Sequence, residues 1–213
     1  KAYGVWERMP ESVRHYLSSH EVSTPPPAAT PAPHRYMVVK TRELFDAAAG
    51  RAAQLGLRPL PLTSLLSGES REVGRVLVAV AREVAHSGQP VASPCALIAT
   101  GETSVRLTNG GAGEGGPNQE LAAGACLELE ADANIAVLAL DTDGSDGPTD
   151  VAGALTDWTT PLRAAQAGVD LPACLYEHDV SRALRAAGDA VITGPTGTNV
   201  NDLVVMVVLP DAA

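Results

Sequence analysis

Two polar loops, each containing glycine and each following a short apolar run, constrain the fold of this chain more than any other feature. The first occupies residues 141–150 (DTDGSDGPTD) and follows the apolar run 135–140. The second occupies residues 193–202 (TGPTGTNVND) and follows the apolar run 190–192. Strands that end in such loops build the ligand crevices of open α/β sheets. The pattern therefore predicts an α/β fold with a polar crevice at one edge of a sheet.

Composition and charge narrow the classes of partner. The 213 residues are 45% hydrophobic but only 3% aromatic, an aliphatic composition typical of sheets covered by helices. The net charge is −10, and the only lysines are Lys1 and Lys40. Because no basic patch is available to replace counterions, we expect neither a nucleic acid nor an anionic membrane as partner.

The cysteines and the termini bear on the compartment. Cys95, Cys126 and Cys174 are far apart and odd in number, so they form neither a disulfide framework nor a zinc motif. No segment has the length and apolarity of a membrane span, and no signal peptide is visible. We therefore expect a cytoplasmic protein. Since the first residue is Lys and not Met, we also expect a fragment of a longer chain.

We expect three regions along the chain. Residues 1–35 are predicted to form a short helix and a Pro-rich linker, residues 36–92 a partial α/β segment, and residues 93–213 a further α/β domain. In the middle region the patterns predict a strand at 36–39, a helix at 42–55, an edge strand at 57–62 and a helix at 70–87. In the last region they predict strands at 96–99, 103–107, 135–140, 191–192 and 203–209, and helices beginning near residues 117, 160 and 178.

A glycine-rich loop precedes the helix predicted from residue 117. Residues 111–116 (GAGEGG) match the pattern G-x-G-x-x-G between a predicted strand and that helix, the context of a dinucleotide fingerprint. Glycines let a phosphate approach the backbone, and a helix N-terminus adds N–H donors. Glu114, however, places a negative charge where a pyrophosphate would lie. The loop therefore favours a phosphate or carboxylate over NAD, with a structural turn as the alternative.

The acidic loop indicates a cation or a polar ligand. Asp141, Asp143, Asp146 and Asp150 fall within ten residues and would repel one another if unpaired. The spacing is not that of an EF-hand, because Gly144 stands at the fourth position and no Glu closes the loop. We predict a site for Mg²⁺ or a substrate hydroxyl, with a solvated acidic turn as the alternative.

Other catalytic motifs are missing from the sequence. The loop at 193–202 offers hydroxyls and amides without a nucleophile and base, so a turn held by Thr and Asn side chains is its alternative interpretation. The five histidines are scattered, and no G-x-S-x-G motif occurs. No lysine follows a glycine loop in the Walker A manner. These observations argue against acyl transfer and against a P-loop kinase.

Four segments carry a family resemblance. They are GET at 101–103, GEGGPNQE at 113–120, DTDGSDGPTDVAG at 141–153 and TGPTGTNVND at 193–202. In this order and spacing they resemble the MOFRL domain of glycerate 2-kinases, over about residues 93–213. Residues 3–90 resemble the closing part of the Rossmann-like first domain of that family. The resemblance implies a C-terminal MOFRL-like α/β domain preceded by a partial Rossmann-like α/β segment.

The resemblance also implies a reaction and a set of site residues. The family transfers the γ-phosphoryl group of ATP to the 2-hydroxyl of D-glycerate, with Mg²⁺, in a cleft between two domains. Asp143 would orient or deprotonate the hydroxyl, and Asp141 and Asp146 are the candidate metal ligands. The residues expected to line the substrate or phosphate pocket are Gly115, Gly116, Asn118, Gln119, Glu120, Thr196, Thr198 and Asn199, with Arg106 as the nearby cation.

Departures from the family pattern keep alternatives open. Many relatives have Arg where this chain has Pro117, and the family's amino-terminal glycine and lysine segment is absent from these residues. The expected partners are glycerate and a nucleotide, with an N-terminal kinase half or a second copy of the chain as candidate protein partners. One alternative function is an NAD(P)H-dependent hydroxypyruvate reductase. The other is a ligand-binding module without catalytic activity.

Overall fold

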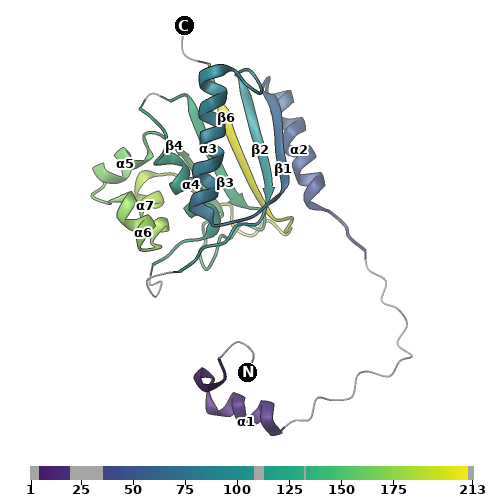
Figure 1. The fold of residues 1–213 in the computed structure, drawn as a ribbon, viewed down its shortest axis with the longest axis vertical. Helices are drawn as coiled ribbons and strands as arrows, with labels where there is room; N and C mark the ends of the chain where they lie inside the picture. Colours follow the sequence, from purple (N-terminus) through teal and green to yellow (C-terminus); the bar gives the residue numbers. More distant parts are fainter. Residues whose placement is uncertain (1–4, 20–35, 108–112, 132, 211–213) are drawn as a thin grey trace. The chain divides into compact units, whose positions relative to one another are not determined.

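The computed structural model describes residues 5–19, 36–107, 113–131 and 133–210, and it divides into two units (Figure 1). The first unit, Lys1–Met37, contains a short 3-10 helix, Trp6–Arg8, and helix α1 (Glu11–Ser19), neither of which has a buried residue. The second unit, Val38–Ala213, contains the sheet, the core and all predicted site residues.

A six-stranded mixed sheet forms the centre of the second unit, in the order β1-β2-β6-β3-β4-β5. Within this described sheet β1 and β2 are parallel, and all the other neighbouring strands are antiparallel. Pro59 and Pro61 lie in β1, at the edge of the sheet as predicted, because proline cannot donate to a second neighbour. The strands are β1 (Arg58–Leu66), β2 (Cys95–Gly101), β3 (Ile135–Asp141), β4 (Gly153–Asp157), β5 (Ala190–Val191) and β6 (Asp202–Val208).

Helices cover both faces of the sheet (Figure 1). Helix α2 (Thr41–Gln54) buries Phe45 and Ala52 against Ala96 and Ile98 on one face. The opposite face carries the larger core, to which α3 (Ser70–Ser87), α4 (Pro117–Cys126), α5 (Thr160–Gln166), α6 (Leu171–Tyr176) and α7 (Val180–Ala187) contribute.

Helices α3 and α4 cross closely because glycine lies on each side of the contact. A Cβ atom at Gly74 of α3 would overlap the carbonyl oxygen of Leu121. A Cβ atom at Gly124 of α4 would lie 2.7 Å from the carbonyl oxygen of Arg71. This close crossing fixes where α4 begins, and therefore where its N-terminal residues lie relative to the sheet edge.

The α/β class is confirmed, and most predicted elements are present. The segment 36–92, which the sequence patterns separate from 93–213, contributes α2, β1 and α3 to the same sheet and core. The strand predicted at 36–39 is wrong: these side chains are exposed and form no ladder with the described strands. The strand predicted at 103–107 is reduced to an isolated bridge between Glu69 and Ser104. None of the helices in the described residues is long and apolar enough to span a bilayer.

Candidate functional site

The polar segments converge at one edge of the sheet. Gly101 ends β2, Asp141 ends β3 and Asp202 begins β6. Since β6 runs antiparallel between the other two strands, Asp202 is in register with both Gly101 and Asp141. The loop after β3 and the loop before β6 therefore leave the sheet side by side.

Hydrogen bonds join these two loops directly. The Oγ1 of Thr142 donates to the carbonyl of Asn201 at 2.8 Å and accepts from the amide of Val200 at 2.9 Å. The amide of Thr196 donates to the carbonyl of Asp143 at 3.1 Å, and its Oγ1 donates to the carbonyl of Thr142 at 2.5 Å. Two segments that are about fifty residues apart thus form one polar layer.

Asp143 lies within this layer and contacts another predicted site residue. Its Oδ1 accepts from the amide of Ser145 at 2.8 Å and from the Ser145 hydroxyl at 3.0 Å. Its Oδ2 accepts from Nδ2 of Asn199 at 3.2 Å. Asp141 braces the same loop, because its Oδ1 accepts from the amide of Asp143 at 3.0 Å. Thr198 lies farther along the second loop, and its carbonyl accepts from Thr196 at 3.2 Å.

Asp146 lies under the first turn of α4 and is only 1% exposed. Its carboxylate accepts from the amides of Asn118 and Gln119 at 3.1 and 2.9 Å, and from both their side-chain amides at 3.1 Å. These four donors match the acceptor capacity of a carboxylate. Burial raises the pKa of Asp146 above its ordinary value, and the hydrogen bonds from these donors offset part of that rise. Asp146 thus caps the helix from a distant loop, which an N-terminal dipole favours.

Gln119 and Glu120, predicted to line the pocket, point into the protein. Gln119 is fully buried, and its Oε1 accepts from the hydroxyl of Ser181 at 2.5 Å. Glu120 is 2% exposed and lies 2.6 Å from Nδ1 of His178 and 3.0 Å from Nη2 of Arg71. These contacts tie α4 to α7, to the turn before it and to α3, so both residues support the site from beneath.

The glycine loop is described only from Gly113 onward, and Gly111 lies outside the described residues. A Cβ atom at Gly115 would lie 2.7 Å from Cγ2 of Val180, and one at Gly116 would overlap the carboxylate of Asp146. Both glycines are therefore required by packing within the protein. The helix itself begins at Pro117, as predicted, and Gly116 is its N-cap.

Arg106 follows β2 on an exposed segment. Its backbone amide donates to the carboxylate of Glu69 at 3.1 Å. Its guanidinium has no ion-pair partner among the described residues, so it is available to an anion at this end of the molecule.

Asp202 is the site residue that the sequence patterns did not single out. It is 8% exposed, and burial raises its pKa to about 7. The charges of Asp141, Asp146 and Glu102 also raise this pKa, whereas a hydrogen bond from the side chain of Asn118 lowers it. A sequence signal did exist. Asp202 opens the strand DLVVMVV, in which the alternate residues Val204, Met206 and Val208 are buried, so alternation places an acidic side chain on the core-facing side.

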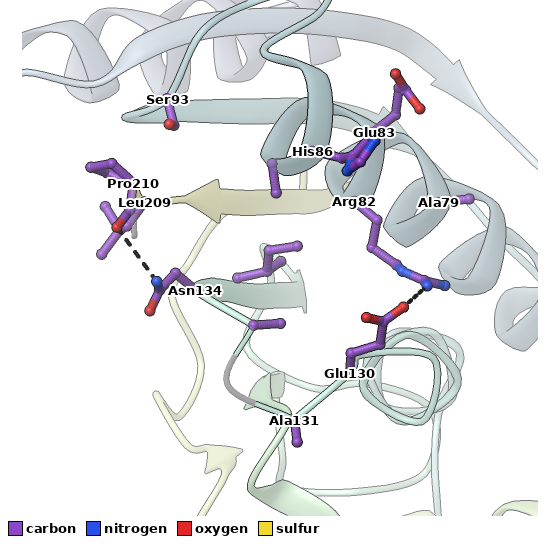
Figure 2. A pocket seen from close by; sticks show the side chains of 13 residues that line it. Ala79, Arg82, Glu83, His86, Ser93, Glu130, Ala131, Asn134, Leu209 and Pro210 are labelled. Atoms are coloured by element: carbon purple, nitrogen blue, oxygen red, sulfur yellow. Dashed lines mark hydrogen bonds and ion pairs between the residues drawn. The ribbon is translucent and has the colours of Figure 1, made fainter. Parts of the chain in front are cut away.

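A hollow of about 720 Å³ lies at the opposite end of the sheet (Figure 2). It lies among α3, the start of β3 and the residues that follow β6. Arg82 of α3 pairs with Glu130 there, and Nδ2 of Asn134 donates to the carbonyl of Pro210 at 3.4 Å. This hollow contains none of the predicted site residues. We therefore place the candidate site at the other end of the strands, where Asp141 ends β3 and Asp202 begins β6, and we call this place the acidic edge.

Comparisons with known proteins relate this chain to one family. The MOFRL family model matches residues 95–202, a stretch that includes every candidate site residue. A glycerate 2-kinase of Pyrococcus horikoshii is 37% identical over 209 residues, covering 97% of this chain and 47% of that protein. A protein of Agrobacterium vitis, provisionally named a hydroxypyruvate reductase, is 39% identical over 201 residues, covering 94% of this chain and 45% of that protein.

The fold agrees with a solved structure as well. The crystal structure of a glycerate kinase from Thermotoga maritima matches with a TM-score of 0.79 and 34% identity, covering 98% of this chain and 50% of that one. The chain thus spans about half the length of the relatives it matches. Its polar segments lie within the matched stretch and meet at one sheet edge, and the chain belongs to the MOFRL family.

Proposed function

We propose that this chain is the C-terminal part of a glycerate 2-kinase, which transfers the γ-phosphoryl group of ATP to the 2-hydroxyl of D-glycerate. The observation that carries the proposal is the junction of the 141–150 and 193–202 loops beside the N-terminus of α4. Relatives that match nearly the whole chain are named glycerate kinases. Phosphoryl transfer needs positioning and charge neutralisation more than covalent chemistry from the protein, and a polar layer of this kind suits it.

The proposed cofactors are ATP and Mg²⁺, and the two fit this edge differently. Carboxylate oxygens suit Mg²⁺, which would neutralise the phosphates during transfer. The phosphates themselves need positive charge, and Arg106 is the exposed cation nearest in sequence to the end of β2. Because the chain spans about half of its relatives, we propose that further cations come from the other half of a full-length protein.

Different residues take different roles in this proposal. Asp143 orients the acceptor hydroxyl or accepts its proton, and Asn199 and Thr196 hold the Asp143 loop in place. Asp146 acts as a helix cap and not as a metal ligand, because four N–H donors occupy its oxygens. Gln119 and Glu120 hold the start of α4 against its neighbours.

The test is a coupled kinase assay on a full-length protein that contains this chain. Asp143→Asn should lower kcat by roughly 10² to 10⁴, the contribution of a lost acid–base group, with little change in melting temperature. Asp150→Asn is the matched control, because Asp150 is an exposed residue of the same loop that pairs with Arg185. Full turnover by the Asp143 variant would remove this residue from the mechanism. Ordinary turnover by the 213-residue chain alone would contradict the need for a second half.

A reductase is the second candidate, since two relatives from Agrobacterium vitis carry that name provisionally. Gly115 and Gly116 pack against Val180 and Asp146, which leaves these two glycines less able to approach a pyrophosphate. We therefore expect no change in NADH fluorescence on mixing with the protein. Saturable micromolar binding of NADH would favour the reductase over the kinase.

The compartment proposed for this chain is the cytoplasm. Cys95, Cys126 and Cys174 are unpaired and buried, as expected for thiols in a reducing environment.

A further inference from the structure

Asp141 and Asp202 face each other at the acidic edge. They are in register across the antiparallel pair of β3 and β6. Side chains two residues apart share a face of a strand, so each carboxylate continues the row of core-facing residues of its strand. Those rows are Ile135, Val137 and Ala139 on β3, and Val204, Met206 and Val208 on β6. Directly opposed residues have Cβ atoms about 4.5–5.5 Å apart, and like charges in that position repel.

No side chain of the described residues neutralises this pair. Gly101, the other cross-strand neighbour of Asp202, has no side chain to offer. Asp146 and Glu102 add negative charge close by. Neither Asp141 nor Asp202 forms an ion pair with a described lysine, arginine or histidine. Asp141 uses its Oδ1 to accept from the amide of Asp143, which leaves its Oδ2 available.

A buried amide oxygen beside the pair points to a ligand independently of the charges. Asn118 is 1% exposed, and its Oδ1 has no hydrogen-bond partner among the described residues. The same amide donates through Nδ2 to Asp146 at 3.1 Å, and a side-chain hydrogen bond from Asn118 lowers the pKa of Asp202. A buried acceptor without a donor is unfavourable, and the amide that carries this one contacts the carboxylates of Asp146 and Asp202. Oxygen atoms of this kind gather around a hard cation.

We propose that Asp141, Asp202 and the Oδ1 of Asn118 bind one divalent cation of the Mg²⁺ class. The proposal rests on the kinase function proposed above, and it names the residues through which this chain would hold the metal. Mg²⁺ is usually held by one or two carboxylates together with waters and substrate phosphates, and not by a complete protein cage. A site of this kind does not require three His, Cys, Asp or Glu side chains close together. The described residues contain no such cluster.

Mn²⁺ binding to the 213-residue chain, measured by electron paramagnetic resonance, tests this site without an activity assay. We expect one site that Mg²⁺ displaces. Asp202→Asn and Asp141→Asn should each weaken it at least about tenfold, a loss typical even of residues that only support a metal ligand. Asp150→Asn removes the same charge from an exposed position of the same loop and should leave the affinity unchanged.

A second readout separates a metal ligand from a structural residue. Mg²⁺ should raise the melting temperature of the wild-type chain and of Asp150→Asn, but not of Asp202→Asn, because a ligand stabilises only a state that binds it. Equal Mn²⁺ affinity in wild type and Asp202→Asn would overturn the proposal. So would an equal loss in Asp150→Asn, or no binding by wild type at millimolar Mn²⁺. Metal binding at this site in a full-length protein without glycerate kinase activity would instead refute the proposed function alone.

Discussion

Replacing Asp202 by Asn should remove a pH dependence of stability that the acidic edge creates. The pKa of Asp202 is about 7 in the folded chain, against an ordinary value of 3.8. Between these two values the folded chain holds a proton that the unfolded chain has released. The free energy of unfolding therefore falls as the pH rises from about 4 to 7, and the stability is fully present only below about pH 4.

The magnitude follows from the size of the shift. A shift of about three pKa units at 1.36 kcal/mol each corresponds to about 4 kcal/mol over the whole interval. About 2–3 kcal/mol of this falls between pH 5 and pH 8, the range in which the wild-type residue changes from mostly protonated to ionised. The Asn variant carries no charge at either pH. We expect its stability relative to wild type to increase by about 2–3 kcal/mol from pH 5 to pH 8.

Urea unfolding followed by circular dichroism, in the presence of EDTA, measures this difference. Asp150→Asn is the control, and its stability should run parallel to wild type, because Asp150 is exposed and its surface pair with Arg185 contributes little. If the stability of wild type and of Asp202→Asn depended on pH in the same way, burial and charge repulsion would not raise the pKa of Asp202. If a cation binds between Asp141 and Asp202, addition of Mg²⁺ should reduce the pH dependence of the wild-type stability.

Two further predictions concern glycine packing and the helix cap. Gly74→Ala should destabilise the chain by about 1–3 kcal/mol in urea unfolding, because its Cβ atom would overlap the carbonyl of Leu121. Gly50→Ala in α2, where a Cβ atom meets nothing within 4 Å, should instead stabilise by about 0.5–1 kcal/mol, and equal effects would contradict the packing argument. Asp146→Asn should destabilise the chain by about 1–3 kcal/mol, because at least one of the four N–H donors loses its acceptor. An unchanged midpoint of urea unfolding would show that the cap is dispensable.

Local patterns in the sequence were enough for most of the secondary structure. The helix predicted at 70–87 coincides with α3, whose apolar residues recur at helical spacing. The prolines of β1 correctly predicted an edge strand. The patterns failed where an element depends on its neighbours. Residues 36–39 are apolar but have no strand to pair with, whereas β4 follows a polar loop and is a strand because β3 and β5 pair with it.

The sequence also located the two loops and the start of α4, because glycine, proline and aspartate have strong local preferences. It did not identify Asp146 as the cap of α4. Asp143 and Asp146 lie three residues apart in one loop, yet the first contacts Asn199 and the second caps α4. Which distant segment a side chain meets depends on the path of the chain, and the loop residues alone do not specify it.

What the sequence by itself determined is the α/β class, the family resemblance and the polar segments that carry it. Only the tertiary structure brought Asp202 opposite Asp141, 61 positions away in the sequence, and placed the amide of Asn118 beside Asp202. The physical reason is that strand register and helix crossing are set by packing over the whole core, including the close approach allowed by Gly74. Charge repulsion and burial at the sheet edge exist only once that packing is complete.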